Sequence, residues 1–214
     1  MKPDAFPGNL SPLQAELLKA FQGEGFFLTG GSALVGFYGH DRVTRDLDLF
    51  TRSHEAFEEG PGWLGAAVEA LGASLDPIRT YPAFRRYQVC RGEEQTLVDL
   101  VFEPVPPVYP PRPIPGSRLA LDLPDEIAVN KLCALVGRGE PRDLADLLFL
   151  DRFGVDLGRA LELASHKDAG VGPDTLLLVL PAVPLSGDPE KLAALRDFRD
   201  DWIGRLRLEV LPPQ

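Results

Sequence analysis

The sequence has few of the residues that cross-link small proteins or build zinc sites. Its 214 residues include two cysteines and three histidines. Cys90 and Cys133 lie far apart, and neither belongs to a Cys-x-x-Cys pattern or a Cys/His cluster. These absences exclude a disulfide framework and a structural zinc site. We therefore expect two free thiols in a fold stabilised by a hydrophobic core.

Long hydrophobic runs and an excess of positive charge are also missing. No segment reaches the roughly 18 apolar residues of a membrane span, and residues 1–12 lack the regions of a signal peptide. We therefore expect a cytoplasmic protein without membrane contacts. The 22 Lys and Arg residues are outnumbered by 32 Asp and Glu residues, giving a net charge of −10. This balance argues against a broad basic surface for nucleic acid, so an RNA contact would need a local patch.

The first half of the chain predicts a mixed sheet flanked by helices. Strand-like patterns occupy residues 26–29, 44–50, 75–79, 84–91 and 96–103. Apolar residues at helical spacing occupy 11–22, 32–38 and 63–71. Arg91-Gly92-Glu93-Glu94 predicts a hairpin turn between the last two strands. This combination is typical of the α/β (α+β) class.

A proline-rich segment separates this half from a helical one. Seven of the residues 104–115 are proline, so the segment cannot form a helix or a central strand and should run extended. Helical patterns follow, at about 122–135, 142–152, 157–165, 173–180 and 189–208. We predict an α/β lobe over residues 1–103, a connector over 104–118 and a C-terminal helical lobe over 119–214.

One short region carries enough specificity to suggest a chemistry. A Gly30-Gly31-Ser32 turn follows an apolar strand and precedes a helix, so its bare backbone N–H groups can cradle a phosphate. Asp46 and Asp48 follow in the next strand. Because side chains alternate along a strand, these two carboxylates share one face. A divalent cation between them would offset their repulsion.

A third carboxylate, Asp99, comes from the strand predicted at 96–103. Three clustered carboxylates suit transfer of a nucleotidyl group from an NTP, in which two Mg²⁺ or Mn²⁺ ions neutralise charge on the phosphate oxygens. We expect Asp46, Asp48 and Asp99 to bind the metals, and Asp99 to be placed to take the proton of the attacking hydroxyl.

The same chemistry predicts that residues around the glycine turn contact the phosphates of the NTP. Gly31 and Ser32 would meet the β- and γ-phosphates through backbone N–H groups and a hydroxyl. Arg42, just before the strand of Asp46, would reach a phosphate.

These elements resemble the DNA-polymerase-β-like nucleotidyltransferase superfamily, and most of all its AbiEii/AbiGii-type toxin branch. The matching stretches are Gly30-Gly31-Ser32-Ala33-Leu34, Arg42-Val43-Thr44-Arg45-Asp46-Leu47-Asp48-Leu49, and Lys131 followed by Arg142-Asp143-Leu144-Ala145-Asp146-Leu147. The third acid lies in Leu97-Val98-Asp99-Leu100, at the right place in the order. The resemblance covers roughly residues 26–150.

The resemblance implies a nucleotidyltransferase fold with a mixed sheet, joined to a helical lobe. It implies that Lys131 binds the triphosphate and that Asp143 positions Lys131 or a reacting hydroxyl. It also implies the toxin of a toxin–antitoxin or phage-defence pair, with a cognate antitoxin as partner. Such a toxin would transfer NMP from an NTP to a hydroxyl of tRNA or of a protein.

Other interpretations stay open. The glycines can form a turn that needs positive φ, Lys131 can pair with an acid one helical turn away, and Asp143 can cap its helix. Aminoglycoside nucleotidyltransferases share the Gly-Ser and Asp-x-Asp core, and the acidic net charge favours a cationic small acceptor. A non-catalytic module that binds a nucleotide or a partner protein is a third alternative.

Basic and aromatic residues cluster around the predicted hairpin. The cluster contains Arg79, Arg85, Arg86, Arg91, Tyr81, Phe84 and Tyr87. It favours either an RNA-contacting patch or a solvated sheet edge guarded by charge.

Overall fold

The computed structural model describes residues 9–185 and 188–210, which divide into two compact units. The first unit ends at Leu123 and the second begins at Pro124. This boundary lies later than the one we predicted. Strands β6 (Arg112–Pro113) and β7 (Ala120–Leu121) belong to the sheet of the first unit, so the proline-rich segment completes that unit.

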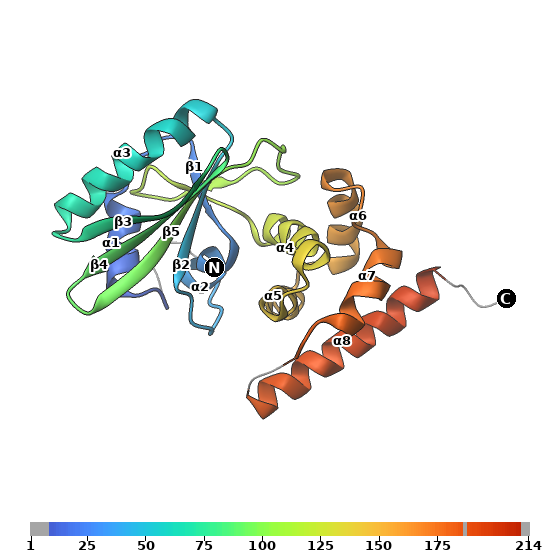
Figure 1. Ribbon diagram of the computed structural model, residues 1–214. Helices are drawn as coiled ribbons and strands as arrows, with labels where there is room; N and C mark the ends of the chain where they lie inside the picture. Colours follow the sequence, from blue (N-terminus) through green and yellow to red (C-terminus); the bar gives the residue numbers. More distant parts are fainter. Residues whose placement is uncertain (1–8, 186–187, 211–214) are drawn as a thin grey trace. The chain divides into compact units, whose positions relative to one another are not determined.

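Within the described residues, the first unit holds a seven-stranded sheet in the order β3-β4-β5-β2-β1-β7-β6 (Figure 1). The other strands are β1 (Phe26–Thr29), β2 (Asp46–Thr51), β3 (Ser74–Tyr81), β4 (Phe84–Arg91) and β5 (Glu94–Phe102). Strand β2 runs parallel to β5 and antiparallel to β1. The mixed sheet is therefore confirmed, as is the hairpin turn that pairs Arg91 with Glu94.

The helices of this unit are α1 (Pro12–Ala20), α2 (Gly30–Phe37) and α3 (His54–Ala70). Helix α3 packs closely on one face of the sheet, where a Cβ on Gly60 would lie 2.9 Å from Cζ of Phe26 and 3.1 Å from Cδ1 of Leu100. Leu47, Leu49 and Leu100 are buried. This face therefore forms the core of the unit, and the opposite face presents its polar side chains.

Helix α3 begins nearer the N-terminus than the predicted range 63–71, and it contains Pro61. Proline lacks the N–H that would bond the carbonyl four residues earlier, which is that of Phe57. Nη1 of Arg85 donates to that carbonyl at 3.1 Å. At the helix start, Oγ of Ser53 accepts from the backbone N–H of Ala56. A long-range donor and a cap therefore sustain the longer helix.

Helix α1 is tied to the starts of two central strands through Gln14, whose side chain is buried. Nε2 of Gln14 donates to the carbonyl of Thr44 at 3.3 Å and to Oγ1 of Thr96 at 3.1 Å. Oγ1 of Thr96 in turn donates to the carbonyl of Arg45. These bonds fix the point where β2 and β5 begin side by side.

The described part of the second unit is helical, as predicted, and contains α4 (Pro124–Arg138), α5 (Pro141–Phe153), α6 (Leu157–Lys167), α7 (Pro173–Val179), the short 3₁₀ helix η1 (Leu180–Ala182) and α8 (Pro189–Val210). Its core includes Leu132, Leu135, Leu144 and Leu147. Among the described helices of the chain, none combines the length and apolar character needed to cross a bilayer.

Candidate active site

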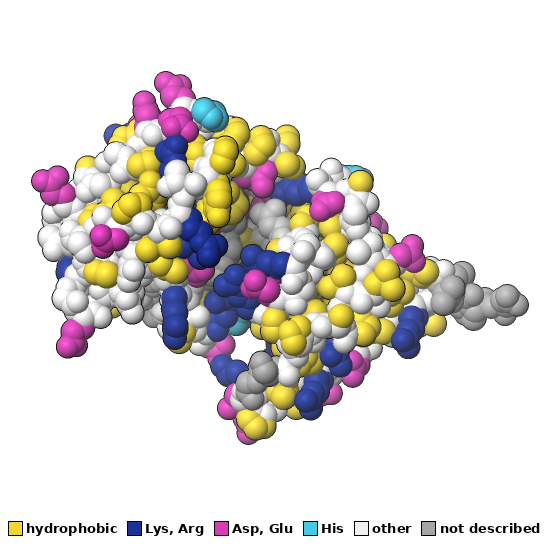
Figure 2. Space-filling model, in the orientation of Figure 1, with side chains coloured by type: hydrophobic (Ala, Val, Ile, Leu, Met, Phe, Trp, Pro, Cys, Tyr) yellow, Lys and Arg dark blue, Asp and Glu magenta, His cyan; other side chains and the backbone are white. Residues whose placement is uncertain are grey.

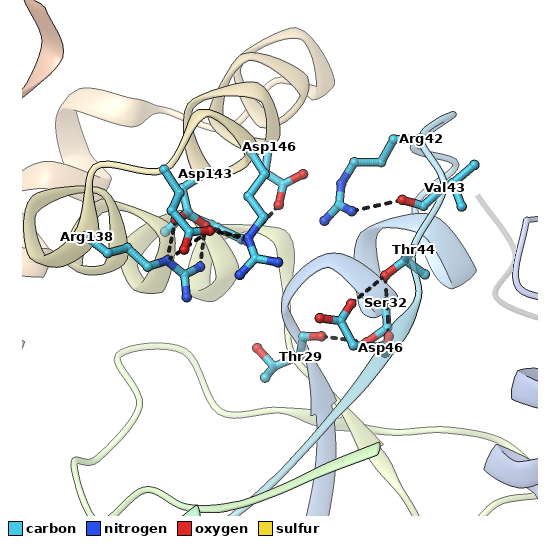
Figure 3. Close-up of polar contacts among 12 residues, drawn as sticks. Thr29, Ser32, Arg42, Val43, Thr44, Asp46, Arg138, Asp143 and Asp146 are labelled. Carbon is cyan, nitrogen blue, oxygen red and sulfur yellow. Dashed lines mark hydrogen bonds and ion pairs between the residues drawn. The ribbon is translucent and has the colours of Figure 1, made fainter. Parts of the chain in front are cut away.

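Two carboxylates lie on one face of β2. Along this strand Leu47 and Leu49 are buried, whereas Asp46 and Asp48, which alternate with them, are half-buried. Oδ1 of Asp46 accepts a hydrogen bond of 3.1 Å from Oγ1 of Thr44, which lies just before the strand (Figure 3). The alternation of the strand therefore brings both acids together on the face opposite the core.

The glycine turn lies directly against one of these acids and against Arg42. Gly30 has a φ of 63°, and a Cβ on it would lie 2.6 Å from Oδ2 of Asp48. A Cβ on Gly31 would lie 1.9 Å from Nη2 of Arg42. Nη1 of the same guanidinium donates to the carbonyl of Val43 (Figure 3). The two glycines thus let a carboxylate and a guanidinium approach the backbone at the start of α2.

Ser32 connects the glycine turn to β2, the strand that carries Asp46 and Asp48. Its buried hydroxyl donates to the carbonyl of Thr29 at 3.1 Å (Figure 3) and accepts from the backbone N–H of Asp48 at 3.3 Å. In the structure this hydroxyl therefore holds the end of β1 against the middle of β2. Its direct contact with a triphosphate stays a prediction.

The third predicted acid lies beside the first two. In the parallel pairing of β2 and β5, Asp48 and Asp99 are direct partners, so their side chains share a face. The side chain of Asp99 is almost fully buried, with 5% exposed. Across the β4–β5 hairpin Asp99 is paired with Arg86, and the two side chains form an ion pair. The structure therefore brings Asp46, Asp48 and Asp99 to one face, together with a guanidinium.

The two acids of β2 fit a magnesium or manganese ion by the chemistry of their donors. Mg²⁺ prefers carboxylate oxygens, and it is commonly held by one or two carboxylates plus the phosphates of a substrate. Asp46 and Asp48 supply such a pair, and Asp48 lies against the Gly30 turn where a triphosphate would be cradled. Among the residues that the structure describes, no three Asp, Glu, His or Cys side chains form a preorganised metal cluster.

The second unit places Lys131 of α4 in a buried ionic cluster. Its Nζ lies 3.0 Å from Oδ1 of Asp143 and 2.6 Å from Oδ2 of Asp146, both on α5 and fully buried. Arg138 also binds Asp143, through bonds of 2.7 and 2.8 Å (Figure 3). Lys131 and Asp143 are thus brought together, and Lys131 pairs with acids of another helix instead of its own.

The charges of this cluster are stabilised by one another. Burial disfavours the charged form of Lys131, but Asp146 and Asp143 outweigh it and raise the pKa of its amine. Burial likewise opposes the charge of Asp143, yet the hydrogen bond from Arg138 and the charge of Lys131 together lower the pKa of that carboxyl. Both groups are therefore charged at neutral pH.

Sequence reasoning missed three residues of these clusters, although each left a signal. Arg86 lies opposite Asp99 as soon as the hairpin register is counted from the Arg91–Glu94 pair. Asp146 follows Asp143 by three residues, which places both on one helix face. Arg138 lies seven residues, or two helical turns, after Lys131.

The basic cluster around the hairpin is largely paired with acids. Arg85 binds Glu58, Arg86 binds Asp99, and Arg91 binds Glu16 and Glu94. Tyr87 is buried. On the face shown in Figure 2, Lys and Arg side chains are interspersed with Asp and Glu. These contacts favour the interpretation as a charged sheet edge over that of an RNA patch.

Comparison with known protein families identifies the family to which a chain with this site belongs. The family described as nucleotidyl transferase AbiEii toxin, of type IV toxin–antitoxin systems, matches residues 13–209, which is most of the chain. The chain belongs to this AbiEii family. It is thus a member of a family of nucleotidyltransferase toxins, as its glycine turn and Asp-x-Asp strand suggested.

Solved structures similar to this AbiEii chain share its fold. JHP933 from Helicobacter pylori is 21% identical, with a TM-score of 0.55 over 94% of this chain and 97% of that chain. MenT4, a nucleotidyltransferase toxin from Mycobacterium tuberculosis, is 17% identical, with a TM-score of 0.57 over 92% of this chain and 88% of that chain. At these identities the likeness shows the nucleotidyltransferase fold. A comparison with curated proteins found no match.

Replacing Gly31 of the AbiEii chain by alanine should displace Arg42 without unfolding the protein. The new Cβ would overlap Nη2 of Arg42, which is the mobile end of a long side chain, and Gly31 has no positive φ. We expect the free energy of unfolding to change by less than about 0.5 kcal/mol. We expect NTP affinity to fall roughly tenfold, because a charge-assisted contact is worth about 1.5–3 kcal/mol. Calorimetry with NTP and urea unfolding measure the two effects.

Gly65→Ala is the matched control for this substitution. Gly65 lies inside α3, and a Cβ there meets nothing within 4 Å. We expect unchanged NTP affinity and equal or slightly higher stability, since alanine favours helix over glycine by about 1 kcal/mol. Equal NTP affinity of Gly31→Ala and the parent chain would contradict a role for Arg42 at the turn.

Replacing Asp143 by asparagine should destabilise the helical unit of the AbiEii chain. The change leaves Lys131 with one acid and removes the carboxylate that Arg138 binds, and breaking a buried pair costs about 3–5 kcal/mol. Because the pKa of Asp143 is lowered by folding, its contribution is complete above the unfolded value of about 3.9 and is lost as pH falls below it.

Urea unfolding followed by circular dichroism at pH 7 and pH 3.5 checks this prediction. The parent chain should lose more stability between the two pH values than the Asp143→Asn variant does. Asp151→Asn, on the same helix, is the control and should behave like the parent. A parallel loss in parent and Asp143→Asn would show that another group causes the acid sensitivity.

Proposed function

We propose that this AbiEii protein transfers a nucleoside monophosphate from an NTP to a hydroxyl of RNA, with tRNA as the acceptor. It would act as the toxin of a toxin–antitoxin pair. The observation that carries the proposal is the convergence at the start of α2. There the backbone of Gly30 and Gly31 is contacted by Asp48 and by the guanidinium of Arg42, and Asp46 lies on the same strand face as Asp48.

The proposed roles follow from the chemistry of these groups. Backbone N–H groups at the start of α2 would bind the triphosphate, helped by the positive end of the helix dipole. Arg42 can offer paired N–H donors to phosphate oxygens and neutralise their charge. Ser32 would hold Asp48 in place, because its hydroxyl accepts from the Asp48 backbone N–H.

Asp46 and Asp48 are the residues that would hold Mg²⁺ or Mn²⁺. The bound ion would neutralise charge that develops on the phosphate oxygens during transfer. Lys131 and Asp143 are proposed to act on the triphosphate, as the resemblance to the family implies. Lys131→Met, tested for NTP affinity by calorimetry, examines that role independently of the acids of β2.

The toxin role is supported by the family, which is described as part of type IV toxin–antitoxin systems. We infer from it a cognate antitoxin as partner. The identity of the acceptor goes beyond what the family description supports. The net charge of −10 keeps a cationic small molecule as the second candidate acceptor, since an acidic protein attracts cations over long range.

Labelling experiments test the proposal. The full chain is incubated with each α-³²P-labelled NTP, Mg²⁺ and total tRNA, and the label is followed on denaturing gels. We expect label in tRNA, and we expect Asp46→Asn and Asp48→Asn to lower its rate by at least about 100-fold, because even residues that only orient metal ligands are worth about 10–100-fold. Asp76→Asn, an exposed carboxylate on β3, should retain the parent rate.

Other acceptors are tested in parallel with total protein and with a panel of aminoglycosides. Label in an aminoglycoside alone would replace tRNA by a small-molecule acceptor, and label in protein alone would replace it by a polypeptide hydroxyl. Absence of any labelled product together with absence of NTP binding would overturn the nucleotidyl-transfer proposal and favour a non-catalytic partner-binding module.

A further inference from the structure

The third acid, Asp99, is fully engaged by a protein side chain. Nε of Arg86 donates to Oδ1 of Asp99 at 2.7 Å, and Nη2 of Arg86 donates to Oδ2 at 2.6 Å. Both carboxylate oxygens therefore accept from one planar guanidinium, which is the strongest geometry for such a pair. With 5% of its side chain exposed, Asp99 has little contact with solvent.

Arg86 is held in this position by the sheet. The β4–β5 hairpin pairs Arg86 directly with Asp99, and the β2–β5 pairing places Asp48 next to Asp99 in the same row. The guanidinium also lies over the ring of Phe84, with its Cζ 5.6 Å from the ring centroid. The strand register and the stacking on Phe84 thus hold the positive charge of Arg86 beside Asp99 and Asp48.

The positive charge of Arg86 acts on all three acids. The hydrogen bonds from Arg86 to Asp99 raise the pKa of the guanidinium most, and the charges of Asp46 and Asp48 raise it further. A guanidinium is charged at every working pH in any case. The acid face of β2 and β5 therefore carries its own permanent cation.

We propose that Arg86 takes the place of a metal ion at the third carboxylate. Asp99 is then a positioning residue that orients Arg86, and the divalent cation is held by Asp46 and Asp48 with the phosphates of the nucleotide. This inference rests on the proposed function, and it replaces the expectation that Asp99 binds metal by a different proposal.

The geometry disfavours a second ion at Asp99. Such an ion would have to displace two short charge-assisted hydrogen bonds and would lie close to a fixed positive charge. The Nε and Nη2 edge of Arg86 faces Asp99, so Nη1 lies on the far side of the guanidinium. With 29% of its side chain exposed, Arg86 can present these remaining N–H groups to a phosphoryl or acceptor oxygen of the substrate.

Counting bound Mn²⁺ tests the proposal without any need for turnover. The full chain is titrated with Mn²⁺ in the presence of a nucleoside α,β-methylene triphosphate, and free Mn²⁺ is measured by electron paramagnetic resonance. We expect one Mn²⁺ per bound nucleotide, held more tightly in the complex than by the nucleotide alone. Asp48→Asn should weaken that site at least tenfold, and Asp99→Asn should change its affinity by less than about threefold.

Two results would overturn this inference alone and leave the proposed function standing. One is a count of two Mn²⁺ ions per bound nucleotide in the parent chain, of which Asp99→Asn removes one. The other is an equal loss of Mn²⁺ affinity in Asp48→Asn and Asp99→Asn. Absence of nucleotide-dependent Mn²⁺ binding in the parent chain would instead overturn both this inference and the proposed function. The Mn²⁺ count therefore distinguishes failure of the inference from failure of the proposed function.

Kinetics of nucleotidyl transfer test the role of Arg86 itself. We expect Arg86→Gln to lower kcat about 100-fold, as for loss of a preorganised charged donor, while the Mn²⁺ count does not fall. Arg86→Lys keeps the charge without the planar fork and should recover part of that loss. Arg207→Gln, at an exposed position of α8, is the matched control and should keep the parent kcat.

Thermal unfolding of every variant separates a folding defect from a catalytic one. If Arg86→Gln unfolds, Arg86→Lys and Asp99→Asn carry the test, because each keeps one partner of the pair. An unchanged kcat in a folded Arg86→Gln or Arg86→Lys variant would overturn the role of Arg86.

Discussion

The register of β2 between β1 and β5 is the constraint on which the first unit depends. Side chains alternate along a strand, so a slip of one residue would turn Asp46 and Asp48 into the core and Leu47 and Leu49 out of it. The hydrophobic effect therefore selects the register that also sets the polar face. The same register places Asp99 of β5 and Thr29 of β1 on either side of Asp48. Packing of the leucines thus determines where the acids lie.

Each unit compensates buried acids with fixed cations. Asp99 is met by Arg86 in the sheet, and Asp143 and Asp146 are met by Lys131 between two helices. Such pairs add little net stability when compared with apolar residues of the same size, but loss of one partner leaves a buried charge. Their effect is geometric, because a bidentate guanidinium or an amine bound between two carboxylates holds side chains in one orientation. Both clusters are therefore rigid before any substrate binds.

Sequence patterns gave the types of most elements, because periodicity reflects which face is buried. The ranges 26–29 and 84–91 are strands with the predicted bounds. The start of α3 was wrong because its Pro61 depends on a hydrogen bond from Arg85, a partner that only the folded chain supplies. The proline-rich segment was predicted to run extended without forming a central strand, and its end does so as the edge strand β6, whose pairing with β7 the sequence pattern did not indicate. The Arg86–Asp99 pair was accessible from the hairpin register, whereas the packing of α5 on Lys131 was not.

The buried amide of Gln14 gives α1 a significance beyond covering the sheet. Through Thr44 and Thr96 it clamps the points where β2 and β5 begin, although those points are separated from it by 30 and 82 positions in the chain. The start of β2 is therefore held by side chains of α1 and β5 as well as by its own leucines. Deletion of α1 would remove the donor of both Gln14 bonds and leave the carbonyl of Thr44 without that partner.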